Sequence, residues 1–198
     1  MNKEELQKYF NIYTEQIPLL IKIKAYWALL HFIIIFPDIC GALESSDGQA
    51  NRSRYKSWAR RYVEDAFLSG EELYDIRCLL LHQGRTLGKL RYPNYKFGQP
   101  DPNGNSVHKC KLSDGSLALD VHMLTNEILK GLDKWFNELS ANPGSTISIN
   151  VQNNIKYISQ KDTSGKPFGN DIVGLNVSIS ASASIPNNPN DPTEIHSL

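Results

Sequence analysis

Apolar residues recur with helical spacing over most of the first 140 residues. Between residues 55 and 67 they fall three or four positions apart, which places them on one face of a helix. Residues 121–139 repeat this spacing, and residues 25–36 are apolar almost all round, as expected of a helix surrounded by other helices. The pattern predicts an all-α fold, a helical bundle.

The first helical region is expected to be long. Residues 3–36 contain one helix breaker, Pro18, so the pattern predicts a single helix with a kink at this proline. Pro37 and Gly41 are expected to end it. Residues 37–48 are then predicted to form a turn-rich connection with at most one short helical turn.

Residues 86–119 have no helical period, and their prolines and glycines mark turns. Two short segments, NYKF and HKCKL, have strand character and are predicted to pair as a β-hairpin. The stretch 85–112 is also basic, because six Lys and Arg residues stand against Asp101 alone. We expect this loop and hairpin to be an insertion in the bundle.

After Asn142 the composition shifts to Asn, Ser, Gly and Pro. Apolar and polar residues alternate at 147–151 and again at 175–179, which predicts a small β-hairpin. The remainder has too little apolar surface to offset the entropy lost on ordering. The sequence therefore predicts two parts, a helical domain over 1–142 and a loosely ordered, β-containing C-terminal extension over 143–198.

Composition narrows the class of protein. There are 21 basic and 21 acidic residues, so net charge selects neither nucleic acid nor membrane as a partner. Three widely spaced cysteines have no metal-type spacing, which favours reduced thiols in a cytoplasmic protein without a metal site. The start has no signal-peptide pattern. Charged residues interrupt the apolar stretch 17–36, so we expect a buried helix and no membrane segment.

One predicted helix combines a core-forming face with residues that carry chemistry. Ser69 and Glu72 have the spacing of a capping box, and Gly84 is placed to end the helix. Arg77 and His82, five residues apart, lie about 140° apart around a regular helix axis. They are expected to flank a wide sector and to reach toward its middle, where a second surface can close over them.

These two side chains suit a particular reaction. His82 lies in the last turn, where unpaired carbonyl groups favour a cation, and imidazole serves as a general acid and base near neutral pH. Arg77 offers a planar set of donors for phosphate oxygens. The pair can therefore promote attack of a ribose 2′-hydroxyl on the adjacent phosphate without a metal ion.

The segment RCLLLH, residues 77–82, resembles the R-x4-H motif of the HEPN superfamily. The segments FPDICGALES (36–45), Y..W...Y (55–62) and LSGEELYDIRCLLLHQG (68–84), with Trp135 in a late helix, are similar to bacterial HEPN-type proteins. The resemblance covers about residues 12–140. It implies a bundle of four to five helices that forms a homodimer, in which two such helices make one RNA-cleaving groove. The function that it implies is that of a metal-independent endoribonuclease, acting as a toxin or a phage-defence effector.

By this resemblance, Arg77 and His82 are the catalytic pair, and no metal or cofactor is expected. Active members often have a polar residue after the arginine, where this chain has Cys78. The basic segment that follows adds expected substrate contacts through charge and aromatic stacking. The predicted substrate-binding residues are Cys78, Arg85, Lys89, Arg91 and Tyr92.

Two other interpretations stay open. The same pocket could grip RNA or a nucleotide without cutting it, as Cys78 allows. Alternatively, the helix could serve only packing or an interaction, with Arg77 in a salt bridge and His82 as a helix cap. A toxin would also have a cognate antitoxin as its partner.

Overall fold

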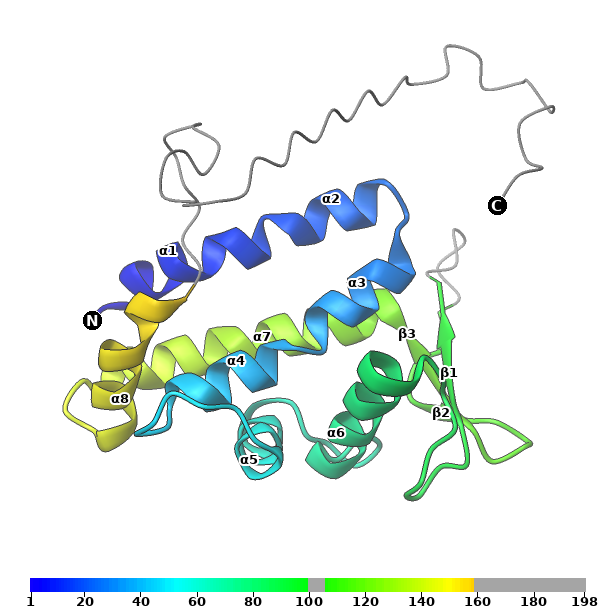
Figure 1. The fold of residues 1–198 in the computed structure, drawn as a ribbon. Helices are drawn as coiled ribbons and strands as arrows, with labels where there is room; N and C mark the ends of the chain where they lie inside the picture. Colours follow the sequence, from blue (N-terminus) through cyan, green and yellow to red (C-terminus); the bar gives the residue numbers. More distant parts are fainter. Residues whose placement is uncertain (100–105, 159–198) are drawn as a thin grey trace, which may run out of the picture. The chain divides into compact units, whose positions relative to one another are not determined.

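The computed structural model describes residues 1–99 and 106–158. They belong to a compact unit, Met1–Lys161, while a second unit, Asp162–Leu198, lies outside the described residues. The described part is mainly helical and carries a small three-stranded sheet (Figure 1). The prediction of a mainly helical fold is therefore confirmed.

The first helical region is a hairpin of helices, so the prediction of one helix over 3–36 is wrong. Helices α1 (Lys3–Thr14) and α2 (Gln16–Lys22) run in one direction, and α3 (Tyr26–Ile33) and α4 (Phe36–Leu43) run back (Figure 1). The chain reverses at Lys24, whose φ of 56° lies in the left-handed region. Pro18 does not break α2, because a first-turn residue has no helical hydrogen bond to lose.

Helix α4 occupies the segment where a turn-rich connection was expected. Pro37 lies in its first turn, where proline is tolerated. Gly41 does not end the helix but lets α4 approach helix α5 (Arg52–Tyr62) closely. A Cβ atom added at Gly41 would lie 3.0 Å from the backbone carbonyl of Arg54. This glycine therefore serves packing between helices.

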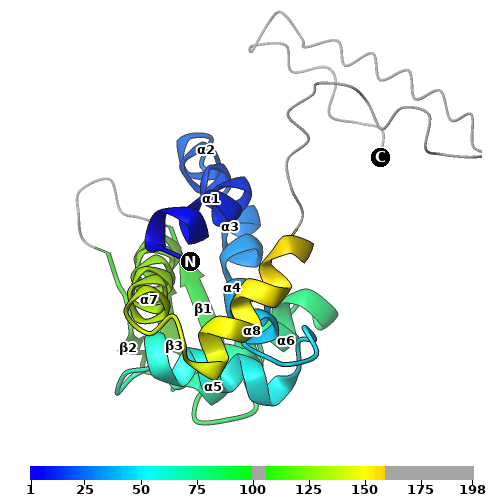
Figure 2. The ribbon, with the colours of Figure 1, turned by 90° about the vertical axis from the view of Figure 1, so that its left-hand side faces the viewer.

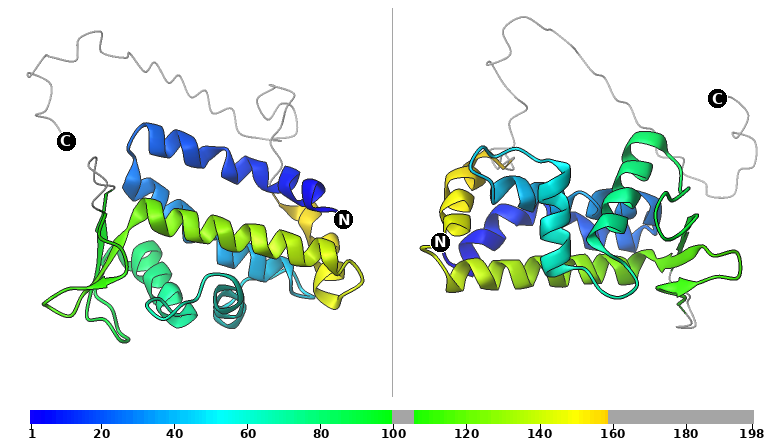
Figure 3. Two further views of the ribbon diagram at one scale, coloured as in Figure 1. Left: turned by 180° about the vertical axis from the view of Figure 1, so that it is seen from behind. Right: turned by 90° about the horizontal axis from the view of Figure 1, so that it is seen from below.

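The long helix α7 (Val121–Ala141) runs the length of the unit, and α5 and α6 (Gly70–Cys78) cross it (Figure 3). Gly131 of α7 lies against the carbonyl group of Tyr62, only 3.0 Å from where its Cβ would be. Aromatic rings fill the core between the helices, and Trp135 contacts both Phe10 and Phe136. The largest fully buried side chains are Trp58, Trp135, Tyr55, Tyr95, Phe10 and Phe36.

The sheet differs from the predicted hairpin. Strands β1 (Tyr95–Gly98) and β2 (Cys110–Lys111) do not pair with each other; both pair with β3 (Leu117–Asp120), in the order β1-β3-β2. The β1–β3 pair is parallel and the β2–β3 pair is antiparallel. β3 takes the central place because it is buried throughout. It leads directly into α7, whose N-cap is Asp120.

Residues 146–154 form helix α8 (Thr146–Asn154), so the predicted strand at 147–151 is wrong. A short 3-10 turn, Ile155–Tyr157, follows. α8 lies at one end of the bundle against α4 and α7 (Figure 2). Its asparagines donate to the carbonyl end of α4: Asn150 to Glu44, and Asn154 to Leu43 at 3.0 Å. The compact unit thus extends beyond the boundary expected at 142, and the predicted strand at 175–179 lies outside the described residues.

One described stretch, Tyr26–Leu43, is long and apolar enough to cross a membrane by length and composition, with a mean hydropathy of 1.7. Half of this stretch is buried inside the unit. A core helix of a water-soluble protein passes the same test, so the stretch is weak evidence for a membrane segment.

Candidate active site

The site is built on α6 and the turn that follows it. Ser69 and Glu72 form the predicted capping box at the start of α6. Gly84 ends the segment with a φ of 58°, as predicted for a left-handed C-terminal residue. Between Cys78 and Gly84 the helix widens into a π-helical turn, Leu79–Gln83, and the Gly84 amide donates to the Leu79 carbonyl. Such turns are rare in proteins, and those that occur are often found at functional sites.

The π turn changes the relation between Arg77 and His82. A turn closed by an i to i+5 hydrogen bond brings residues five apart nearly over one another. Arg77 Nη1 lies 2.6 Å from His82 Nε2, and the imidazole is exposed to solvent. The two side chains therefore converge, as expected of groups that reach toward the middle of one sector, but the 140° separation of a regular helix does not apply across the π turn.

The contact fixes the form of the imidazole. A guanidinium group has only donors, so Nε2 of His82 must accept and must carry the lone pair. The remaining proton of the neutral ring then resides on Nδ1. As a hydrogen bond, the contact thus directs the lone pair of Nε2 toward the guanidinium group.

Asp38 of α4 completes the arrangement, and sequence reasoning missed it. Its carboxylate accepts a hydrogen bond from Arg77 Nε at 2.8 Å, and both side chains are largely buried. Burial opposes the charge on Arg77, but Asp38 outweighs burial and raises the pKa of the guanidinium. A carboxylate inside the apolar segment FPDICG was the available signal, because a buried acid requires a partner.

Cys78 and Tyr74 lie beside this pair on the same face of α6, one turn apart. The Cys78 thiol, together with burial, raises the pKa of Tyr74. The Cys78 side chain is half-buried, and it contributes to the raised pKa of Arg77. Asp38, Arg77, His82, Cys78 and Tyr74 form the α6 cluster.

The expected contacts in the basic segment lie in several places. Arg85 and Lys89 are exposed, and Arg85 follows the π turn directly. Arg91 is held by Glu72, with Nε and Nη2 each 2.8 Å from a carboxylate oxygen. Tyr92 is buried, and its hydroxyl donates to the Phe67 carbonyl. The placement of Arg91 and Tyr92 thus gives no support to their expected role in binding RNA, whereas Arg85 remains near His82.

Other histidines have structural partners. His31 Nδ1 donates a hydrogen bond to the carbonyl of Trp27 at 2.8 Å. His108 is buried between the Asp120 amide and the Glu127 carboxylate. Within residues 1–99 and 106–158, no group of three or more His, Cys, Asp or Glu side chains is arranged to hold a metal ion.

Acid should weaken the region around His108. Lys109 pairs with Asp65 and Glu127. Burial raises the pKa of both carboxyl groups, but Lys109, with His108 at Glu127, outweighs burial, and the pKa of each lies below its ordinary value. The two ionised carboxyl groups therefore stabilise the fold fully at a pH above their ordinary pKa. This stabilisation is lost as the pH falls through their lowered pKa. We expect the free energy of unfolding, measured in urea between pH 6 and 3, to fall less steeply for Glu127→Gln than for the wild type. Equal slopes would contradict this.

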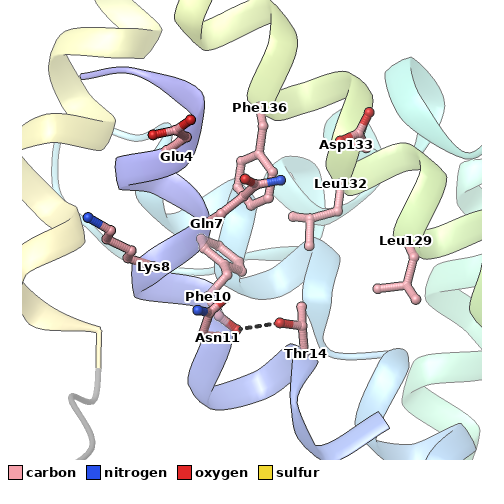
Figure 4. Close-up of a pocket in the computed structure, with 10 residues that line it drawn as sticks. All are labelled: Glu4, Gln7, Lys8, Phe10, Asn11, Thr14, Leu129, Leu132, Asp133 and Phe136. Carbon is pink, nitrogen blue, oxygen red and sulfur yellow. Dashed lines mark hydrogen bonds between the residues drawn. The ribbon is translucent and has the colours of Figure 1, made fainter. Parts of the chain in front are cut away.

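A cavity of about 530 Å³ lies away from the α6 cluster. It runs between α1 and α7, and Figure 4 shows Phe10, Leu132 and Phe136 lining it beside polar side chains of α1. Among the ten residues that line it, none is a histidine, cysteine or arginine. This cavity therefore has no chemistry in common with the predicted site.

Comparison of the chain with protein-family models, with curated proteins and with solved structures finds no match.

Proposed function

We propose that the chain is a metal-independent endoribonuclease of the HEPN type, with Arg77 and His82 as its catalytic residues. The observation that carries the proposal is the 2.6 Å contact between an exposed imidazole and a guanidinium group. A regular α-helix would have kept the two apart. The π turn that joins them also buries Leu79 and Leu80 in the core.

In the proposed reaction Arg77 acts on the phosphate and His82 acts on the attacking hydroxyl. An RNA phosphate attracts the guanidinium of Arg77, which leaves Nε2 of His82 free to take the proton of the ribose 2′-hydroxyl. The 2′-oxygen attacks phosphorus, and Arg77 stabilises the negative charge that builds up on the phosphate oxygens. The 5′-oxygen leaves with a proton returned by an imidazolium group. The products carry a 2′,3′-cyclic phosphate and a 5′-hydroxyl.

The partners belong to the same proposal. His82 is exposed, and so are Gln83 and Arg85 beside it, so a second copy can approach this end of α6. A homodimer through these helices would supply a second imidazole to protonate the leaving oxygen. As a toxin or phage-defence effector, such an enzyme would act in the cytoplasm, and a toxin would be held in check by a cognate antitoxin.

The test is cleavage of a labelled single-stranded RNA in EDTA. The wild-type protein should produce ends that carry 2′,3′-cyclic phosphate, detected by their resistance to phosphatase until acid opens the ring. A substrate with a single 2′-deoxy nucleotide should resist cleavage at that position. Absence of cleavage products on every RNA tested, with folded protein, would overturn the proposal.

A second candidate is a non-catalytic RNA-binding or dimeric interaction module of the same fold. The Arg77–Asp38 ion pair favours it, because an arginine neutralised inside its own chain is what a packing role requires. Binding of RNA without cleavage would support the binding module. Overproduction separates the functions in cells, because a toxin-type ribonuclease slows growth and a packing domain does not.

Asp38 should act as a positioning residue for Arg77. We expect Asp38→Asn, which keeps the shape and removes the charge, to lower the cleavage rate about 10- to 100-fold through misplacement of the guanidinium. It should also lower the free energy of unfolding by about 1.5–3 kcal/mol. The control is Asp47→Asn, which breaks the exposed Asp47–Arg54 pair and should leave cleavage unchanged. An Asp38→Asn protein with wild-type kcat would contradict the positioning role.

A further inference from the structure

Helix α5 carries a row of cations on the side that meets α6. Arg52, Lys56 and Arg60 follow one another at intervals of four residues, so they lie along one face of α5. Lys56 and Arg60 both pair with a single carboxylate, Glu71. Arg52 is exposed and has no ion pair within the part of the chain that the structure describes. The row therefore carries more positive charge than the nearby acid neutralises.

Lys56, in the middle of the row, is affected by the cations on either side of it. Burial, followed by the charges of Arg52 and Arg60, lowers the pKa of Lys56. An anion bound beside Arg52 would relieve this repulsion. The excess positive charge of the row therefore favours binding of an anionic ligand from outside the described residues.

Tyr74 connects this row to the α6 cluster. Arg52 and Lys56 lie 5.7 and 5.5 Å from the centre of the Tyr74 ring, a distance at which a cation is attracted to the ring. Tyr74 lies one turn before Cys78 on the same face of α6, and Cys78 follows Arg77 in the chain. The turn of α6 from Tyr74 to Cys78 is about 5.4 Å long, and a stacked strand advances about 3.4 Å per nucleotide, so a strand of a few nucleotides can reach from Arg52 to Arg77.

We propose that Arg52 binds a backbone phosphate of single-stranded RNA flanking the phosphate held by Arg77. Tyr74 fixes the position of the Arg52 guanidinium by its ring. The contact recognises the sugar–phosphate chain and not the base, because the row offers charge and no element that could enter a groove. This inference rests on the proposed function, since it extends the same site along its substrate.

The test uses a fluorescent 2′-O-methyl oligonucleotide, which has no 2′-hydroxyl to attack phosphorus and so reports binding alone. Fluorescence anisotropy at salt concentrations from 50 to 200 mM gives the affinity and its salt dependence. Arg52→Gln should weaken binding about fivefold at 50 mM salt and reduce the slope of log K against log salt by about 0.7, the value for one phosphate of a single strand. Tyr74→Leu should shift both quantities in the same direction.

The matched control is Lys130→Gln, an exposed cation on α7 outside the row, which should bind as the wild type does. Arg52→Gln with the affinity and slope of this control overturns the inference, and so does a wild type that does not bind the oligonucleotide at 50 mM salt. A wild type that binds but never cleaves RNA, with a smaller slope in Arg52→Gln, removes the proposed function and leaves the phosphate contact. If the wild type cleaves RNA, and Arg52→Gln has an unchanged KM and an unchanged slope, the proposed function stands and the phosphate contact of Arg52 is overturned.

Discussion

His82→Ala should lower the rate of RNA cleavage by about 10²- to 10⁴-fold, the range typical for loss of a general acid–base group. Alanine has no atom that can take the proton of the 2′-hydroxyl. The fold should persist, because His82 is exposed and Arg77 keeps its bond to Asp38. The measurement is the initial rate of cleavage of a labelled RNA in EDTA, with circular dichroism as the check on folding.

The matched control is His122→Ala, which removes an imidazole from the first turn of α7, away from the α6 cluster. It should cleave at the wild-type rate. If His82→Ala cleaves as fast as this control, the imidazole has no catalytic part and the proposed mechanism is wrong. A loss of cleavage in both variants would instead indicate unfolded protein.

Trp135→Ala should lower the free energy of unfolding by about 3–5 kcal/mol, the usual cost of removing a large buried ring. The Trp135 ring is 0% exposed and packs edge-on against Phe10, with 5.7 Å between ring centres. Its indole nitrogen also donates to Glu44 at 2.8 Å. Burial raises the pKa of Glu44, so loss of this donor leaves a desolvated carboxyl group with one partner fewer.

Urea unfolding followed by circular dichroism checks this expectation. Met123→Ala is the control on the same helix: its side chain is 44% exposed, and the change should stay within about 0.5 kcal/mol of the wild type. Equal midpoints for Trp135→Ala and Met123→Ala would mean that α7 is not the central helix of the core.

Signals that act over a few residues predicted the local structure well. The capping box at Ser69 and the left-handed Gly84 are set by neighbouring backbone groups, so their spacing in the sequence was sufficient. Helices α5 and α7 were predicted because each has one apolar face. The reversal at Lys24 was missed because a positive φ at a lysine has no compositional signature.

What depends on distant partners was not predictable from local pattern. The stretch 147–151 alternates like a strand, but Asn150 and Asn154 bond to the end of α4 and favour a helix there. Strand β3 is the shared partner of β1 and β2, and its sequence LALD does not reveal that role. At the candidate site, Arg77 and His82 were identified, whereas Asp38 is separated from them by 39 residues of chain.

Because of the π turn at Leu79–Gln83, the number of residues between the arginine and the histidine does not by itself determine the distance between their side chains. In a regular α-helix the residues that stack are four apart, and here the wider turn absorbs one additional residue. Deleting one residue from this segment would restore the tighter coil and still leave the arginine and the histidine in register. The length of such a motif and the pitch of its helix can therefore vary together over evolution while the distance between the two side chains stays constant.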